Sequence, residues 1–201
     1  MEFYTTEQFL EEFTRIGEPV KFPEIVCAPS GCGKYEFWEY WSVYSKNNRW
    51  NRNNGGKIAL NEYGQPIGEK IRYFNYMDYK YIKQEDGTLK RNYSYPYNLI
   101  YTMRYHHTLD SIILVNSAKE LRDAMKEFRI PYHLIYPSNE LNYRMSLEDK
   151  KADPKFIEYI DSNWDDFIKS FVSDEYAIKH SLEDSKIDQG IMIGIENPSE
   201  R

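Results

Sequence analysis

The sequence predicts a three-layer α/β fold with a mainly parallel central sheet. An apolar run at 22–27 leads into a glycine-rich turn, and the charged and aromatic stretch at 35–45 can continue as a helix. The buried strand at 111–115 is followed by a helical pattern at 117–128 and by another strand at 131–136. Strand, helix and strand in such short order favour parallel pairing with a right-handed crossover.

Length and composition fit a single domain. The chain has 201 residues, 41% of them hydrophobic and 16% aromatic, which supplies enough apolar surface for one sizeable core. We expect this domain to span 1–180, and a C-terminal strand at 191–195 with a polar tail to lie within 181–201.

Charge and hydropathy exclude several classes of partner. The chain has no run of about 18 apolar residues and no signal-peptide pattern at its N-terminus, so we expect a soluble cytoplasmic protein without a membrane partner. The net charge of −6 argues against broad nucleic-acid binding, because counterion release needs an excess of Lys and Arg. The spacing of Cys27 and Cys32 suits neither a zinc site nor a disulfide framework, so both are expected to be reduced thiols.

Caps and turn residues place the remaining elements. Thr5 with Gln8 resembles a capping box for a first helix, and the Asn-, Arg- and Gly-rich stretch at 46–57 is typical of an exposed loop. A strand around 71–76 is expected to end near Asp78, before a turn at 85–87, and we interpret 46–95 as an irregular insert. Helices are predicted from Pro96 to about His107, after a Ser117 cap, and from Pro154 onward with an apolar side packed in the core.

The turn Ala28-Pro29-Ser30-Gly31-Cys32-Gly33-Lys34 is typical of a P-loop, and a fold of the P-loop NTPase type is therefore predicted. In such a loop, successive backbone N–H groups converge on phosphate oxygens at the start of a helix. Gly31 and Gly33 supply permissive dihedral angles, and Lys34 would place an ammonium on the β- and γ-phosphates of ATP. The predicted nucleotide-binding residues are therefore Ser30, Gly31, Cys32, Gly33, Lys34 and Tyr35.

Two positions depart from the pattern G-x-x-x-x-G-K-[ST]. Ala28 stands at the first position, which is a mild change, and Tyr35 stands at the last. A short hydroxyl at the last position normally binds Mg²⁺, and a phenol cannot reach the same point without moving the backbone. The alternative interpretation is an ordinary turn between a strand and a helix; the strand before it and the helix after it favour the phosphate site.

Further short motifs follow the loop in a defined order. They are an acidic strand end at Asp78, Arg91-Asn92, Tyr95-Pro96-Tyr97-Asn98, the strand 110–115, Glu120-Leu121-Arg122, Tyr136-Pro137 and Asn163-Trp164-Asp165. In this order they resemble a family of small P-loop proteins, common in phages and large viruses, that are similar to (deoxy)nucleoside monophosphate kinases. The resemblance covers most of the chain from Pro23 to about Ile168.

The resemblance implies transfer of the ATP γ-phosphoryl group to a (deoxy)nucleoside monophosphate, with ATP and Mg²⁺ as cofactors. It implies catalytic roles for Lys34, Arg144 and Asp110, with Asp110 also holding the metal, and acceptor binding by Asp78, Arg91 and Asn98. It also implies a mobile lid at 138–153. That segment keeps Arg144 but has Lys150 and Lys151 where the family usually has a second arginine, and lysine lacks the bidentate geometry of arginine.

Each residue has a structural alternative. Asp110 can cap a turn, Arg144 and Arg91 can be solvated, and Asn98 can be a hydrogen bonder at a helix start. His106 and His107 are adjacent and make a poor metal pair. Aromatic and basic residues at 38–57 could hold a single nucleic-acid strand, but a packed helix face followed by a solvated loop is favoured.

Three functions remain open on the sequence. The leading hypothesis is a nucleoside monophosphate kinase-like phosphotransferase. The second is a kinase-like fold without transfer activity that binds a partner, for instance a host protein blocked by a phage. The third is an NTP hydrolase or a polynucleotide end kinase, which the lack of a strong basic patch weakens.

Overall fold

A computed structural model describes residues 7–8, 11, 21–41, 71–105 and 111–183. Five predicted features lie wholly or mostly outside these residues: the first helix, the loop at 46–57, the His106-His107 pair, Asp110 and the strand at 191–195. Among the described helices, none is long and apolar enough to cross a bilayer.

A five-stranded parallel sheet forms the centre of the fold. Its strands stand in the order β2-β5-β1-β6-β7, and every neighbouring pair is parallel. Their bounds are β1 Glu24–Ala28, β2 Ile71–Tyr73, β5 Ile112–Asn116, β6 His133–Pro137 and β7 Ile178–Leu182. The prediction of an α/β fold with a mainly parallel sheet is confirmed. The strands β5 and β6 are parallel as expected, but β1 lies between them, so they do not pair with each other.

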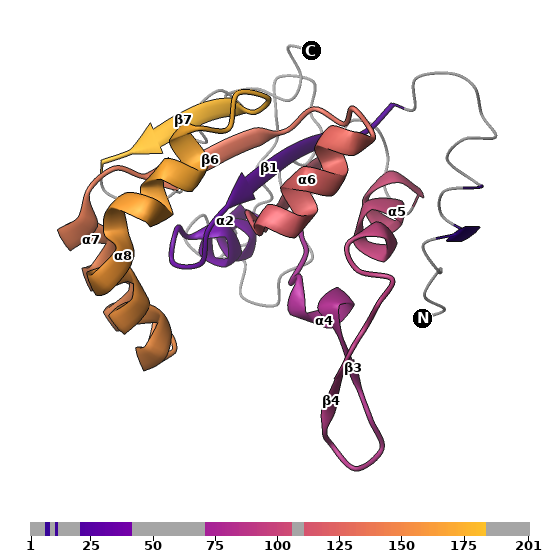
Figure 1. The fold of residues 1–201 in the computed structure, drawn as a ribbon, viewed down its shortest axis with the longest axis horizontal. Helices are drawn as coiled ribbons and strands as arrows, with labels where there is room; N and C mark the ends of the chain where they lie inside the picture. Colours follow the sequence, from indigo (N-terminus) through magenta and orange to yellow (C-terminus); the bar gives the residue numbers. More distant parts are fainter. Residues whose placement is uncertain (1–6, 9–10, 12–20, 42–70, 106–110, 184–201) are drawn as a thin grey trace, which may run out of the picture.

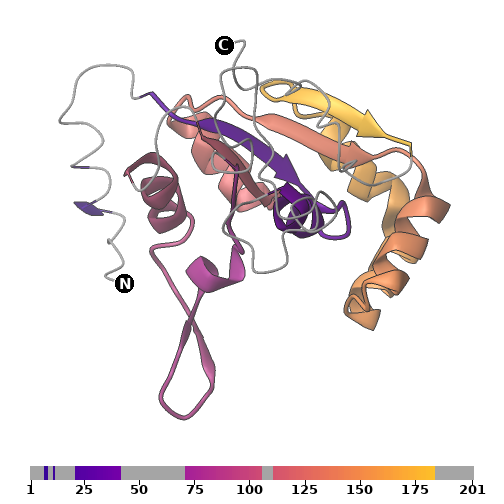
Figure 2. The ribbon, with the colours of Figure 1, turned by 180° about the vertical axis from the view of Figure 1, so that it is seen from behind.

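Six helices in the described residues accompany the sheet. They are α2 Lys34–Trp41, α4 Met77–Lys80, α5 Tyr97–Tyr105, α6 Lys119–Glu127, α7 Glu140–Asp149 and α8 Pro154–Val172. In Figures 1 and 2, α7 and α8 lie at one end of the molecule and α5 at the other, while the antiparallel hairpin of β3 Tyr81–Lys83 and β4 Leu89–Arg91 projects away from the body.

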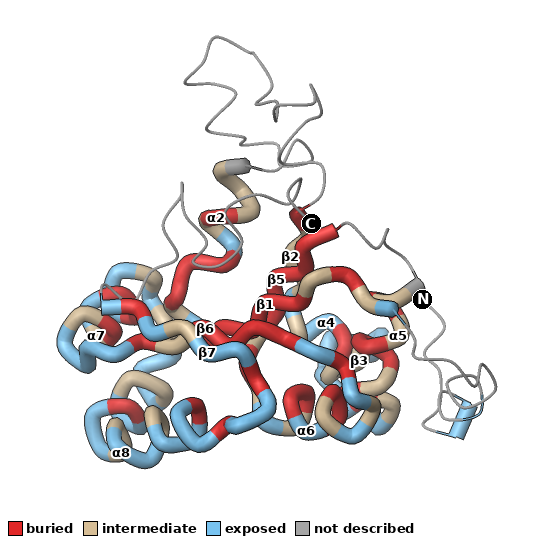
Figure 3. Tube along the Cα trace, turned by 90° about the horizontal axis from the view of Figure 1, so that it is seen from above, coloured by how far each residue is buried: buried red, intermediate tan, exposed pale blue. Residues whose placement is uncertain are grey.

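The strands β1, β5 and β6 bury both faces because their side chains alternate between two cores. Ile25 and Cys27 of β1 pack in one core with side chains of α5 and α6, and Val26 and Ala28 pack in the other with side chains of α2 and α7. Figure 3 shows this layering, with α2 on one side of the sheet and α6 on the other. Helices on both faces explain why these strands are apolar at almost every position, which made them predictable.

Two predictions in the middle of the chain are wrong. The strand expected to end near Asp78 ends at Tyr73, and Asp78 lies in the short helix α4. The described part of the insert at 46–95 is regular rather than irregular, since residues 71–95 contain β2, α4 and the hairpin. The predicted turn at 85–87 joins β3 to β4, and Gly87 has a φ of 83° there.

Two boundaries also differ from the prediction. Ser117 does not cap α6, whose N-cap is Ala118 without a side-chain hydrogen bond; the Ser117 carbonyl instead accepts a hydrogen bond from Arg122 Nε at 3.0 Å. The predicted domain boundary at residue 180 falls inside β7, a sheet strand that was not predicted. This strand stands at the edge of the sheet, and of its residues only Leu182 is buried, so it carries no apolar run.

Candidate functional site

The loop at 28–34 connects the central strand β1 to α2. Gly31 and Gly33 have φ values of 87° and 86°, in the left-handed region that favours glycine, and Cys32 N–H donates to the Pro29 carbonyl at 3.4 Å. Among the residues that the structure describes, the N–H groups of Gly31, Gly33 and Lys34 donate to no acceptor. The turn therefore has backbone donors available for an anion at the start of a helix.

Lys34 reaches back into its own loop. Its side chain is buried, and its Nζ donates to the carbonyls of Ala28 at 2.7 Å and Pro29 at 2.8 Å. Burial lowers the pKa of Lys34 from 10.5 to about 8, because the charged ammonium is removed from water. An ammonium has three N–H donors, so one remains for a phosphate oxygen. These two carbonyls hold the Lys34 ammonium against its own loop.

Helix α7 holds the outer side of the loop. Tyr143 donates its hydroxyl to the Ser30 carbonyl at 2.6 Å, and Ser146 donates to the Gly31 carbonyl at 2.8 Å. In a trans peptide the N–H points opposite to the C=O, so the Gly31 N–H points away from α7. A Cβ on Gly31 would lie 2.7 Å from Leu147 Cδ2, which shows how closely the helix and the loop approach each other.

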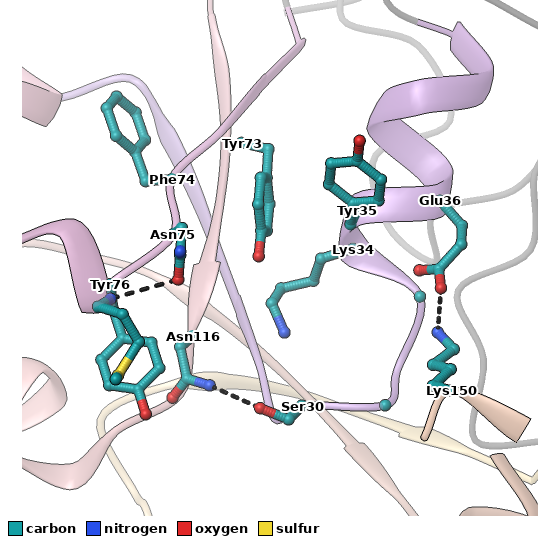
Figure 4. Close-up of a pocket in the computed structure, with 13 residues that line it drawn as sticks. Ser30, Lys34, Tyr35, Glu36, Tyr73, Phe74, Asn75, Tyr76, Asn116 and Lys150 are labelled. Carbon is teal, nitrogen blue, oxygen red and sulfur yellow. Dashed lines mark hydrogen bonds and ion pairs between the residues drawn. The ribbon is translucent and has the colours of Figure 1, made fainter. Parts of the chain in front are cut away.

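A cleft of about 350 Å³ opens beside the loop (Figure 4). Its wall combines loop, aromatic and charged residues: Ser30, Gly31, Gly33, Lys34, Tyr35, Glu36, Tyr73, Phe74, Asn75, Tyr76, Met77, Asn116 and Lys150. A second cleft of about 620 Å³, between α6 and α8, also borders Pro29 and Ser30. The loop therefore has open space on two sides, at the carboxyl ends of β1 and β5, the edge of a parallel sheet where ligands bind.

The first cleft places polar groups from three elements near the loop. Asn116, the last residue of β5, donates its Nδ2 to Ser30 Oγ at 3.4 Å. Glu36 of α2 pairs with Lys150, the residue after α7, at 2.7 Å. Burial opposes ionisation of Glu36, but its hydrogen bond and charge attraction with Lys150 outweigh this and lower its pKa.

Aromatic rings form the opposite side of the cleft. Tyr35 stands at the second position of α2 with 48% of its surface exposed, and its ring lies 5.6 Å from those of Trp38 and Tyr73. Tyr73 comes from the end of β2, so the aromatic wall joins α2 to the neighbouring strand. Such a wall offers faces on which a planar base can stack.

The structure does not bring four of the predicted residues to the loop. Arg144 pairs with Glu148 and Asp161 and borders a different pocket. Arg91 lies in the projecting hairpin and pairs with Glu120 at 3.1 Å. These two cations meet carboxylates of the chain in the described structure, and neither lines the clefts beside the loop.

The two residues predicted to bind the acceptor nucleotide, Asp78 of α4 and Asn98 of α5, have hydrogen-bond partners close by. Asp78 is exposed and accepts a hydrogen bond from Asn75 at 3.4 Å. Asn98 is buried and donates to the Tyr79 carbonyl at 3.1 Å, while its Oδ1 accepts from Leu99 N–H at 2.9 Å. Asn98 therefore does what the alternative interpretation expected, as a hydrogen bonder at a helix start.

Among the residues that the structure describes, those beside the loop do not fit the Mg²⁺ ion that the family resemblance implies. Asp110 lies outside the described residues, and the described residue at the loop end of β5 is the neutral Asn116. Tyr35 replaces the metal-binding hydroxyl, and Glu36 is paired with Lys150. In the described part of the chain, no group of three or more His, Cys, Asp or Glu residues is arranged to hold a metal ion.

Both cysteines are free and buried near the loop. Burial raises the pKa of Cys27 and of Cys32 to about 12. Because the thiolate is the nucleophile, these protonated thiols act as packing residues.

Sequence reasoning placed the loop but missed its neighbours. Tyr73, Asn75, Tyr76 and Asn116 were not predicted as site residues, and Lys150 was noted only as part of a lid. Asn116 could have been predicted as a site residue from the sequence. It ends the clearest buried strand, and the carboxyl ends of parallel strands meet at one edge of the sheet.

Comparisons of the chain with protein families, with curated proteins and with solved structures gave no match. The sheet, the covering helices and the glycine turn are consistent with a P-loop-like α/β protein.

Proposed function

We propose that this protein binds the phosphates of a nucleotide at the loop 28–34 and transfers the γ-phosphoryl group of ATP to a (deoxy)nucleoside monophosphate. The observation that carries the proposal is the buried Lys34 ammonium, held in a glycine turn beside N–H groups without acceptors in the described structure. An ammonium and converging N–H groups form a site for anionic oxygen, and the following helix adds the positive end of its dipole.

The two clefts suit a reaction between two phosphorylated molecules. Both border Ser30, so a donor and an acceptor could approach the loop from different sides. Phosphoryl transfer depends mainly on positioning and charge stabilisation, which Lys34 and the loop N–H groups can supply. The aromatic wall of Tyr35 and Tyr73 would hold a base in the smaller cleft.

The test compares the wild-type chain with Lys34→Met. ATP at about a hundredfold excess over its Kd should raise the Tm of the wild type by about 5–10 °C, and it should not change that of the variant. A coupled assay with ATP and a panel of monophosphates should detect transfer that the substitution abolishes. The matched control is Lys155→Gln, an exposed lysine on α8 that borders neither cleft, which should behave like the wild type.

A second candidate is a nucleotide-binding protein without transfer activity, which could serve to bind a host protein. The observation that favours it concerns arginine, the usual stabiliser of the transferred group. Arg122 is the one arginine among the described residues lining the two clefts, and its guanidinium already bonds the Ser117 carbonyl and Asp174.

The same assays separate the two candidates. A Tm increase with ATP and no transfer to any monophosphate supports binding without chemistry. Transfer that persists in Lys34→Met contradicts the assignment of the loop, and a Tm unchanged by ATP contradicts both candidates.

A further inference from the structure

We propose that the loop binds its nucleotide as the metal-free polyphosphate, with Lys34 and Lys150 as the cations that face it. The inference rests on the proposed function and specifies the form of its ligand. Its starting point is the disagreement between the side chains beside the loop and the magnesium ion that the family resemblance implies.

Tyr35 stands where a metal-binding hydroxyl would be expected. A Ser or Thr after the loop lysine would place a hydroxyl one carbon from the backbone, within reach of a metal on the phosphates. The Tyr35 ring instead packs against Trp38 and Tyr73, and in Figure 4 its hydroxyl points away from the loop. The side chain is committed to the aromatic wall and supplies no oxygen to the phosphate position.

Few oxygen ligands for a metal line the described part of the cleft. Mg²⁺ in nucleotide sites is held through carboxylates and phosphates. Glu36 is the one carboxylate among the described residues that line the smaller cleft, and it is paired with Lys150 at 2.7 Å. Asn116 occupies the end of β5, and its amide donates to Ser30, which leaves a neutral group where a metal site would use a negative one.

The charged side chains of the described cleft favour an anion. Two lysines and one glutamate line the described cleft, so its side chains carry a positive balance. Lys34 is buried against two carbonyls and has no carboxylate partner among the described residues. Burial lowers its pKa to about 8, so a neighbouring anion would stabilise its charged form. Lys150 keeps 26% of its side chain exposed and is held at the rim by Glu36. A polyphosphate can therefore take the place of Glu36 as the counterion of Lys150.

The prediction follows from electrostatics. Free ATP carries more negative charge than Mg-ATP, so two lysines without a metal-binding carboxylate should prefer the free form. We expect the Kd for ATP in excess EDTA to be roughly three- to tenfold lower than the Kd in excess MgCl₂, as measured by isothermal titration calorimetry on the full chain.

Three variants sharpen the test. Lys150→Gln should raise the Kd in EDTA by about tenfold, because one cation at the phosphates is lost. Lys155→Gln, the matched control outside the cleft, should change the Kd in EDTA by no more than about twofold. Tyr35→Ser should reverse the preference toward Mg-ATP, because it restores the hydroxyl ligand.

The outcomes separate this inference from the proposed function. If the wild type binds Mg-ATP and loses binding in EDTA, the inference is wrong while nucleotide binding stands. If Lys150→Gln binds as the wild type does, Lys150 is not one of the cations and the inference is wrong. If neither form of ATP binds the wild type, the proposed function fails and the inference fails with it.

Discussion

Lys34 combines burial with charge, and this sets the chemistry of the loop. Within the described part of the chain its ammonium has two carbonyl acceptors but no carboxylate in contact, so its desolvation is only partly compensated. Such a group stabilises a bound anion and is itself stabilised by it. In the proposed function this residue would link nucleotide binding to proton uptake. Its lowered pKa also links folding stability to pH.

The free energy of unfolding should rise with pH around the pKa of Lys34. The folded chain releases this proton near pH 8 and the unfolded chain near 10.5, so the unfolded state binds more protons between these values. From pH 8 to 9 the wild type should gain about 1 kcal/mol relative to Lys34→Met, measured by urea unfolding.

Comparison with Lys34→Met isolates this effect from the cysteines. Cys27 and Cys32 act in the opposite direction above about pH 9, where the unfolded thiols ionise and the folded ones do not, but both chains carry them. Parallel pH profiles of the two chains would contradict a depressed pKa at Lys34.

At the level of single residues, a local motif was predictable and its surroundings were not. Gly31, Gly33 and Lys34 stand together in the sequence, and their geometry follows from the turn that they form. Lys150 and Tyr73 come from other elements, and only the folded chain shows that they share a cleft with the loop. Arg91 and Arg144 have the right charge for phosphate, but ion pairs with neighbouring carboxylates hold them elsewhere.

Helix α7 lies in the segment that the family resemblance assigns to a mobile lid. In the structure, Tyr143 and Leu147 of this helix are fully buried, and two of its hydroxyl groups bond loop carbonyls. These contacts make α7 a support for the outer side of the loop. The segment was predicted only as polar and charged because its three buried residues, Tyr143, Ser146 and Leu147, are spread among exposed ones.

A methyl group on Gly31 tests how closely α7 and the loop approach each other. Gly31→Ala should lower the free energy of unfolding by about 2–4 kcal/mol, because both the positive φ and a contact of 2.7 Å with Leu147 oppose the added methyl group. Gly87→Ala is the matched control, because Gly87 has nearly the same φ and nothing within 4 Å of the added carbon. Gly87→Ala should lower the free energy of unfolding by about 1 kcal/mol, as measured by chemical denaturation.

The difference between the two alanine variants measures the contact with α7. Equal losses of stability would show that Leu147 and Tyr143 can move aside, and that the helix does not hold the loop.

Elements were predictable where burial leaves a continuous signature. The strands β1, β5 and β6 are buried on both faces and appear as apolar runs. The edge strand β7 carries no such pattern because its conformation depends on parallel pairing with β6, and α4 is only four residues long. The predicted Ser117 cap was wrong because the Ser117 carbonyl accepts a hydrogen bond from Arg122, while its side chain does not cap the helix.

Across the whole molecule, Asp174 joins parts that are distant in sequence. Its carboxylate accepts hydrogen bonds from Arg122 of α6 at 2.6 Å and from Tyr132, which precedes β6, at 2.8 Å. Burial favours its neutral form, but hydrogen bonds from Tyr132, Arg122 and Lys126 outweigh this and lower the pKa of Asp174. This buried cluster fixes α6 against the segment that leads from α8 into β7.

Asp174→Asn should destabilise the fold by about 3 kcal/mol, because it leaves the Arg122 charge buried without its partner. Asp123→Asn is the matched control: Asp123 also pairs with a lysine, but on the surface, so the change should stay within about 0.5 kcal/mol. Urea midpoints with unchanged m values would measure both. Similar midpoints for the two variants would contradict a central role for the buried cluster.

The position of β1 in the sheet has a consequence for how the chain folds. Glu24 pairs with Ile112 and Val26 with His133, so the middle strand has no partner nearby in the sequence. Closing such long loops costs entropy before any pairing compensates for it, and proteins with many non-local contacts fold slowly. During synthesis the glycine turn leaves the ribosome long before β5 and β6, so the sheet that holds the turn can form only after most of the chain has been made.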